Sequence, residues 1–275
     1  MKTLTIHMNE ALKIGKNLSK FSIYSCRPAD KKELKSIIQE RMKTNGDDCD
    51  LNDIDVSLVK DMSFLFCRSK FNGNISKWDM SNVESMYSMF AWSRFNGDIS
   101  NWDVSNVNDM SYLFYDTEFN GDISEWNVSN VKDMHDMFNK AKFTGDISRW
   151  NVSQVEDMSN MFYNSNFNGD ISNWDVSSVK KMNGMFFNSK FNQDISKWDI
   201  HNVENMSSMF ARTKEFNQPI GDWDVSNVKD ISNMFYSSNF NQDISSWKLR
   251  KDCNVDDLFY RCPIKNEFKP KSLQK

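Results

Sequence analysis

The chain has 275 residues and a net charge of −4 at neutral pH, with 26% charged residues. This slightly acidic net charge gives no excess of positive charge that would attract nucleic acid or an anionic membrane surface, so we expect neither partner. Aromatic residues make up 13% of the chain, which is too many for a disordered chain and predicts a packed core. No apolar run of about 18 residues occurs, so the sequence predicts no transmembrane helix and no membrane insertion.

Residues 1–47 lie outside the repeat pattern and are predicted to form an N-terminal segment with a helical cap. No apolar stretch precedes Glu10, so we expect no Sec export signal. Asp30 and Glu33 have the spacing of a capping box, and Gly46 is predicted to end the helix. The apolar face of this predicted helix consists of Leu34, Ile37, Ile38 and Met42.

The cysteine pattern indicates free thiols in a reducing compartment. The count is five, which is odd, and no Cys-x-x-Cys pair occurs. The three histidines are far from the cysteines in sequence, so we expect no zinc site, no other metal and no cofactor. Together with the missing export signal, this favours a cytoplasmic location. The cysteines are Cys26, Cys49, Cys67, Cys253 and Cys262.

Residues 48–262 repeat with a period of 24, apart from one step of 25. Such self-similarity is typical of a solenoid, in which stacked units bury one continuous core. We therefore expect about eight and a half rungs, each rung being one 24-residue turn of the solenoid. The Trp column is Trp78, Trp102, Trp126, Trp150, Trp174, Trp198, Trp223 and Trp247. The first Phe column is Phe71, Phe95, Phe119, Phe143, Phe167, Phe191, Phe216 and Phe240. The second Phe column is Phe66, Phe90, Phe114, Phe138, Phe162, Phe186, Phe210, Phe235 and Phe259.

One rung shows the expected local structure. Residues 98–104 alternate β-formers with polar residues, which predicts a short strand. Residues 106–115 place Met110, Leu113 and Phe114 at i, i+3 and i+4, which predicts a short helix. The fold class is therefore an α/β repeat, with one parallel strand and one helix per rung. Stacked strands would form a long parallel sheet at a spacing of about 4.8 Å.

Two polar columns admit two interpretations. The residue before each core isoleucine and the residue after each column tryptophan are mostly Asp, with Asn as a frequent replacement. Stacked carboxylates could bind calcium, but exchange with Asn favours side-chain bonds to backbone amides. The asparagine after each Phe of the first Phe column predicts an asparagine ladder that satisfies backbone groups at the bends.

Other columns vary from rung to rung and are predicted to face solvent. Opposite charges on neighbouring rungs, such as Glu125 and Arg149, would contribute about 0.2–1 kcal/mol per pair. Aromatic residues that follow the second Phe column, together with Trp92, are candidate anchors for a partner. The alternative is that these rings only cover neighbouring rungs. The candidates are Trp92, Tyr115, Tyr163, Phe187 and Tyr236.

The repeat pattern decays at the C-terminal end. Lys248 and Leu249 replace the usual Asp-Val pair, and Cys262-Pro-Ile264 ends the last rung. We predict that residues 263–275 form a C-terminal tail.

The repeat unit Phe-Asn-Gly-Asp-Ile-Ser-x-Trp-Asp-Val-Ser-Asn-Val-x-x-Met-Ser-x-Met-Phe resembles that of the BspA-like family of bacterial leucine-rich-repeat surface proteins. The resemblance covers roughly residues 28–270. It implies a right-handed leucine-rich-repeat-like solenoid and, for some members, adhesion to host proteins. Secreted members carry an export signal, whereas we expect none at the start of this sequence.

These observations favour a non-enzymatic protein–protein interaction solenoid of the adhesion or scaffold type, acting as a monomer. A glycan-binding or calcium-dependent module is the alternative, because Trp and Asp suit sugars. No motif of a nucleophile elbow, a zinc protease or a P-loop occurs, so we expect no enzyme and no catalytic residues.

Overall fold

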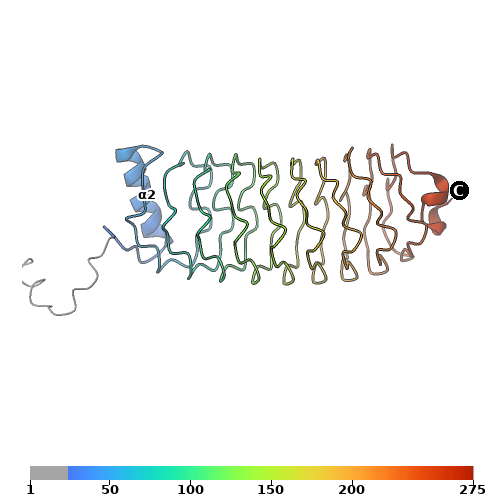
Figure 1. The fold of residues 1–275 in the computed structure, drawn as a ribbon, viewed down its shortest axis with the longest axis horizontal. Helices are drawn as coiled ribbons and strands as arrows, with labels where there is room; N and C mark the ends of the chain where they lie inside the picture. The colour runs from blue at the N-terminus through green and yellow to red at the C-terminus, as the bar shows by residue number, and fades with distance from the viewer. Residues whose placement is uncertain (1–23, 275) are drawn as a thin grey trace, which may run out of the picture.

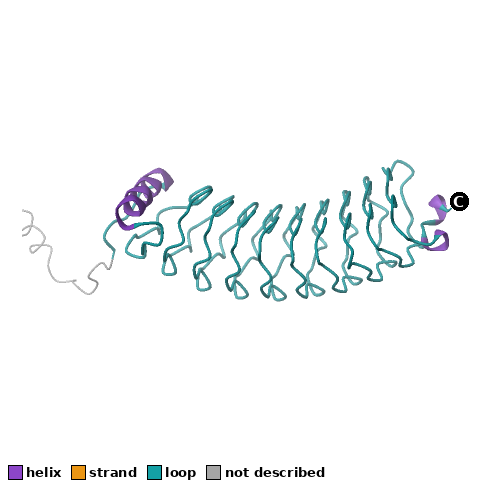
Figure 2. Cartoon of the chain, turned by 90° about the horizontal axis from the view of Figure 1, so that it is seen from above, coloured by secondary structure: helices purple, strands orange, loops and turns teal. Residues whose placement is uncertain are grey.

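The computed structural model describes residues 24–274, which form an elongated row of stacked rungs (Figure 1). Helix α2 (Lys31–Asn45) lies at one end of the row. Two short 3-10 helices, η1 (Asn266–Phe268) and η2 (Lys271–Leu273), lie at the other. Seen from above, the row is gently bowed (Figure 2). The chain is therefore a solenoid, as the repeat predicts. The expected absence of an export signal before Glu10 falls outside the described residues.

The predicted N-terminal helix is confirmed, and so are its caps. The side chain of Asp30 accepts a hydrogen bond from the backbone N–H of Glu33 at 2.9 Å, and the Glu33 carboxylate accepts one from the Ala29 N–H at 2.8 Å. Gly46 ends the helix with a φ of 87°, a left-handed value that suits glycine. Leu34 and Ile38 are buried in the same apolar cluster as the rungs, so α2 closes the N-terminal end of the core.

The α/β detail of the rungs differs from the prediction. Neither the strand expected at residues 98–104 nor the helix expected at 106–115 is present, and both segments are made of tight turns. Isolated parallel bridges link equivalent residues of neighbouring rungs, as between Asp109 and Asp133. This pairing recurs in every step from Asp61 to Asn254. Parallel pairing between rungs therefore falls in the half of the repeat that was expected to be helical.

Backbone hydrogen bonds explain why no helix forms there. Within residues 106–117, alternate N–H groups donate to the next rung: Met110 to the Asp133 carbonyl at 3.0 Å, and Phe114 to the Met137 carbonyl at 3.0 Å. A helix would use these N–H groups inside its own segment. The spacing of Met110, Leu113 and Phe114 instead follows from a β-turn closed by the Leu113 N–H on the Met110 carbonyl at 3.2 Å.

Two positions in each rung, four residues apart, have a left-handed backbone. Tyr112 has a φ of 56° and Asp116 a φ of 52°. The first of them is the third residue of its β-turn, where a positive φ marks a type II turn. Glycine occupies only one of these positions among the described rungs, at Gly184. Each non-glycine residue there costs about 1 kcal/mol, and the hydrogen bonds between rungs hold it in place.

Stacked rings form the core. Phe90 and Phe114 stack with centroids 5.8 Å apart, and Trp102 and Trp126 with centroids 6.4 Å apart. Each indole N–H in the Trp column donates to the backbone carbonyl of a core residue in the preceding rung, as Trp102 does to Ile75 at 3.1 Å. The column tryptophans are only 3–4% exposed. Their predicted role in the core is confirmed.

The polar columns satisfy the backbone at the bends. Asp98 accepts a hydrogen bond from the Ser100 N–H at 3.0 Å, and Asn127 accepts the same bond from the Ser129 N–H at 3.2 Å. These bonds confirm the preferred interpretation, in which Asp and Asn serve the backbone equally. The asparagine ladder is also present, as the Asn120 N–H donates to the Asn96 side-chain oxygen at 2.8 Å.

Candidate interaction surface

The variable residues that follow the second Phe column lie on one edge of the solenoid, which we call the variable edge. Its segments are linked from rung to rung, as the Arg94 N–H donates to the Ser69 carbonyl at 3.4 Å and the Lys142 N–H to the Thr117 carbonyl at 3.0 Å. Equivalent segments therefore stack into one continuous strip. The variable edge comprises residues 67–70, 91–94, 115–118, 139–142, 163–166, 187–190, 211–215, 236–239 and 260–263.

The local backbone positions the outward-facing side chains. The second residue of each segment has a positive φ, such as 58° at Arg68, 55° at Trp92 and 59° at Arg212. These three side chains are exposed, while the neighbouring Phe66, Phe90 and Phe210 enter the core. A left-handed residue thus reverses the chain beside each core phenylalanine and places its own side chain on the edge.

All five predicted anchor residues lie on the variable edge, but in separate groups. Trp92 and Tyr115 contact each other with centroids 4.8 Å apart, and Tyr163 stacks on Phe187 at 4.4 Å. Tyr236 contacts neither group. Trp92 is 40% exposed, whereas the other four are half-buried. The rings therefore cover neighbouring rungs and also expose part of their surface to solvent. Their environment fits both the interpretation as partner anchors and the interpretation as covers for neighbouring rungs.

The sequence prediction missed several aromatic residues of this region. Tyr260, which is 46% exposed, stacks on Tyr236 at 5.2 Å. It follows Phe259 of the second Phe column, so the rule that found Tyr236 also finds it. Phe64 is 45% exposed and contacts Tyr87 at 4.9 Å. The sequence feature that could have identified Phe64 is its position two residues before Phe66 of the second Phe column. Tyr112 occupies the equivalent position before Phe114.

Tyr112 joins these rings to a buried carboxylate. Its ring lies 5.8 Å from that of Tyr87 and 5.4 Å from that of Tyr115. Burial and the nearby Asp136 carboxylate raise the pKa of Tyr112 to about 12, so the phenol stays protonated near neutral pH. Asp136 is 5% exposed and also accepts a hydrogen bond from Asn139. The Asp133 carboxylate, 2.6 Å from His135 Nδ1, raises the pKa of His135.

Basic side chains lie over four of the rings on the variable edge. The guanidinium carbon of Arg68 is 4.7 Å from the Trp92 centroid, and Lys140 Nζ is 5.7 Å from the Tyr115 centroid. Further along, Arg212 lies 5.6 Å from Phe187 and Arg261 lies 5.3 Å from Tyr260. Cations held against aromatic faces form a surface that combines apolar area with positive charge.

Comparison with known protein families gives three overlapping matches, to residues 32–142, 93–190 and 164–271. All three are to the family described as "Mycoplasma protein of unknown function, DUF285". The chain belongs to this family. Together the DUF285 matches cover residues 32–271, which include the whole solenoid, and they identify it as a repeat protein without distinguishing the BspA-like group. No curated protein matches the chain. No solved structure matches it either.

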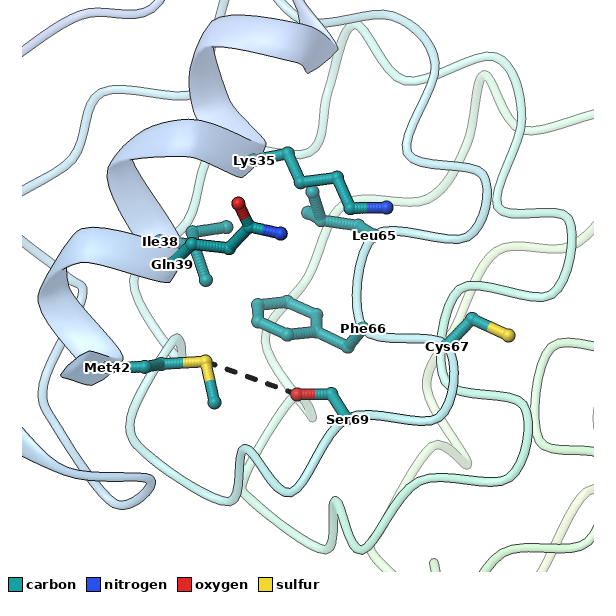
Figure 3. Close-up of a pocket in the computed structure, with 8 residues that line it drawn as sticks. All are labelled: Lys35, Ile38, Gln39, Met42, Leu65, Phe66, Cys67 and Ser69. Carbon is teal, nitrogen blue, oxygen red and sulfur yellow. Dashed lines mark hydrogen bonds between the residues drawn. The ribbon is translucent and has the colours of Figure 1, made fainter.

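The DUF285 chain also has a hollow of about 380 Å³ between α2 and the first rung (Figure 3). Lys35, Gln39 and Met42 approach it from the helix, and Met42 Sδ lies 4.0 Å from Ser69 Oγ on the facing loop. Cys67 lies at the margin, and burial raises the pKa of its thiol. A raised thiol pKa disfavours the nucleophilic thiolate.

Three further features of the described residues concern the cysteines, groups of metal-ligating side chains and membrane spans. All five cysteines are free thiols, as predicted. Residues 24–274 contain no group of three or more His, Cys, Asp or Glu side chains placed to hold a metal ion. In the same part of the chain, no helix is both long and apolar enough to span a membrane.

Proposed function

We propose that this DUF285 solenoid is a non-enzymatic protein-interaction module whose variable edge binds another protein. Variation within the chain is the observation that carries the proposal. Core positions keep Phe, Trp, Val and Met from rung to rung, while the position after each Phe of the second Phe column changes freely. Repeat proteins bind large partners with such extended regular surfaces. The residues at this position are Cys67, Ala91, Tyr115, Asn139, Tyr163, Phe187, Ala211, Tyr236 and Tyr260.

The exposed rings supply the chemistry of an interface. Trp, Tyr and Arg dominate binding energy in protein interfaces, because they combine large contact area with polar groups. Trp92 with Arg68 and Tyr260 with Arg261 place such residues side by side near the two ends of the variable edge. The aromatic area is spread along many rungs, which suits an elongated partner better than a small ligand.

The glycan or calcium alternative has less support from the geometry. Sugar binding by aromatic residues needs open ring faces, and the indoles of the Trp column are almost fully buried. The Asp side chains accept hydrogen bonds from backbone N–H groups, as Asp122 does from Ser124 at 2.9 Å. An enzyme would need a nucleophile, a base and an orienting group that converge in a hollow, and the sequence contains no motif of a nucleophile elbow, a zinc protease or a P-loop.

The finer assignments are proposals as well. The resemblance of the repeat to the BspA-like family supports an adhesion or scaffold role for this surface. We propose that the protein acts as a monomer, because both ends of the core are covered. Leu34 and Ile38 of α2 cover the first rung, and the Phe268 carbonyl accepts a hydrogen bond from Ile244 at 2.9 Å at the last.

A capture experiment tests the proposal. The purified chain, immobilised, would be exposed to lysate of its own source, beside a variant with five edge substitutions. A matched control would carry five exposed substitutions in a polar column on another face. The edge variant is Trp92→Ser, Tyr115→Ser, Tyr163→Ser, Phe187→Ser and Tyr236→Ser. The control is Lys77→Ser, Asn101→Ser, Glu125→Ser, Lys197→Ser and Asp222→Ser.

We expect a protein that binds the native chain and the control but not the edge variant. Circular dichroism must show that all three chains are folded, because four of the five rings are half-buried. Equal capture by all three chains, or capture of no protein, would overturn the variable edge as the binding surface.

A further inference from the structure

The charge of the variable edge is opposite to that of the whole protein. The chain has a net charge of −4, yet the edge carries nine basic and only three acidic side chains. Its acidic residues are Asp116, Glu118 and Glu215. Its basic residues are Arg68, Lys70, Arg94, Lys140, Lys142, Lys190, Arg212, Lys214 and Arg261.

Several cations on another face of the solenoid are paired with carboxylates, whereas those on the edge are mostly not. Lys60 pairs with Glu84 at 2.7 Å, and Lys180 pairs with Glu156 at 2.6 Å, each across neighbouring rungs. On the described variable edge, only Lys190 forms an ion pair, with Glu215 at 3.0 Å. The remaining edge cations are available to a negatively charged partner.

Three of these cations surround one hollow at the C-terminal end of the edge. It has a volume of about 330 Å³, and Arg212, Lys214 and Arg261 line it. Asn188, Tyr236 and Ser237 complete the lining, which contains no acidic residue. Arg212 and Arg261 occupy equivalent places two rungs apart, and both line the hollow.

The side chains around the hollow are held in position. Arg212 lies against the ring of Phe187, and Arg261 lies against the ring of Tyr260. Lys214 Nζ donates to the Ser237 carbonyl at 2.5 Å, which keeps its charge at the margin of the hollow. Guanidinium groups offer a planar fork of donors to carboxylates, and less entropy is lost when their position is already restricted.

We propose that this hollow binds the carboxylates of an acidic polypeptide, which is the partner of the variable edge. This inference rests on the proposed function and specifies the chemistry of the partner. Tyr260, which is 46% exposed, would contact an apolar side chain of the same segment. A nucleic acid that bound along the whole edge would bring its phosphates close to the carboxylates of Asp116 and Glu118, which would repel them. A polypeptide can instead place its carboxylates at the C-terminal rungs alone.

Binding of labelled peptides tests the proposal. An extended peptide of about eight residues, at about 3.3 Å per residue, spans about five rungs. The probes are a fluorescein-labelled peptide that alternates Glu-Asp with Leu, a matched Gln-Asn-Leu peptide, and a thymidine oligonucleotide of similar length. Fluorescence anisotropy with the full chain would report each affinity. We expect binding of the acidic peptide alone, weakened when salt rises from about 0.05 M to about 0.5 M.

Two double variants that change the net charge equally distinguish the effect of the hollow from the effect of the protein's overall electrostatic field. The double substitution Arg212→Gln and Arg261→Gln is expected to weaken acidic-peptide binding about tenfold. The control, Lys180→Gln with Lys229→Gln, removes two cations that are paired with Glu156 and Glu204. This control should change the affinity for the acidic peptide by less than about twofold.

Three outcomes would overturn the proposal. These are no binding of the acidic peptide, equal weakening by both double variants, and tighter binding of the oligonucleotide than of the peptide. The capture experiment distinguishes this failure from failure of the proposed function. The distinguishing result is a captured protein that requires the edge aromatics and still binds the chain that carries Arg212→Gln and Arg261→Gln. That result would support the proposed interaction module and contradict the proposal that its partner is acidic.

Discussion

The indole N–H of Trp126 donates a hydrogen bond to the backbone carbonyl of Ile99, one rung earlier, at 3.1 Å. Trp126 is 3% exposed and also stacks on Trp102. The same side chain thus fills the core and satisfies a buried carbonyl between rungs. Because the bond recurs along the Trp column, the tryptophans join neighbouring rungs by both packing and hydrogen bonding.

Substitution Trp126→Phe tests this double role. Phenylalanine keeps an aromatic ring but leaves the Ile99 carbonyl without its donor, and we expect the free energy of unfolding to fall by about 1–3 kcal/mol. Trp126→Ala should cost about 3–5 kcal/mol, because it also opens a cavity. Urea denaturation followed by circular dichroism measures both values. The control Trp92→Phe, at a 40% exposed position, should cost no more than about 0.5 kcal/mol. Equal losses at the two positions would contradict the role of the indole bond.

Substitution Gly184→Ala tests the left-handed positions. Gly184 has a φ of 63°, and an added Cβ would lie 2.2 Å from Asn160 Oδ1, so the Asn160 side chain must also move. We expect a loss of about 1–2 kcal/mol in the free energy of unfolding, measured by urea denaturation. The matched control is Ser208→Ala in the next rung, where φ is 58° and a Cβ is already present. A loss at Ser208→Ala as large as that at Gly184→Ala would show that the backbone conformation is not the cause.

The Asp column before the core isoleucines predicts sensitivity to acid. A hydrogen bond from the Ser100 backbone N–H lowers the pKa of Asp98 below its ordinary value of 3.8, and Asp122 and Asp170 are lowered in the same way. A carboxylate with a lowered folded-state pKa stabilises the fold fully above its unfolded pKa. That contribution is lost as the pH falls through the folded value. We therefore expect stability to decline below about pH 4.

Replacing these aspartates by asparagine should make the decline less steep, because the amide oxygen keeps the bond to serine and does not titrate. Asn127 and Asn151 already make such bonds in the neighbouring column, which supports the exchange. Thermal melting at several pH values between about 2.5 and 7 would measure it. If the native and substituted chains lose stability in parallel, other carboxylates control the acid transition. The substitutions are Asp98→Asn, Asp122→Asn, Asp146→Asn, Asp170→Asn, Asp194→Asn and Asp243→Asn.

The sequence pattern was a reliable guide to side-chain environment and a poor guide to backbone structure. Met110, Leu113 and Phe114 were predicted to share one apolar face, and all three are buried. The same spacing also predicts a helix, and that prediction is wrong. Spacing shows which side chains enter the core, and a helix and a row of β-turns can satisfy the same spacing. The N–H groups of this segment bond to another rung, and only an assembled stack reveals that choice.

For the candidate surface too, the sequence indicated which residues belong to it but not how they contact one another. The aromatic residues could be picked from sequence because they break the repeat, and all five lie on the variable edge. Their pairing could not be predicted, since Tyr236 contacts Tyr260 and Trp92 contacts Tyr115 across rungs. The hollow between Arg212 and Arg261 was also missed, because the overall charge of −4 concealed a basic edge.

The sequence by itself determined the solenoid, its period, its buried Phe and Trp columns, and the capped helix from Asp30 to Gly46. These features follow from which residues recur and from local capping chemistry, both of which are written along the chain. The tertiary structure alone decided that the rungs use β-turns and parallel bridges, and where unpaired cations gather. Those outcomes depend on hydrogen bonds and charges contributed by rungs 24 or 25 residues apart, whose relative placement exists only after stacking.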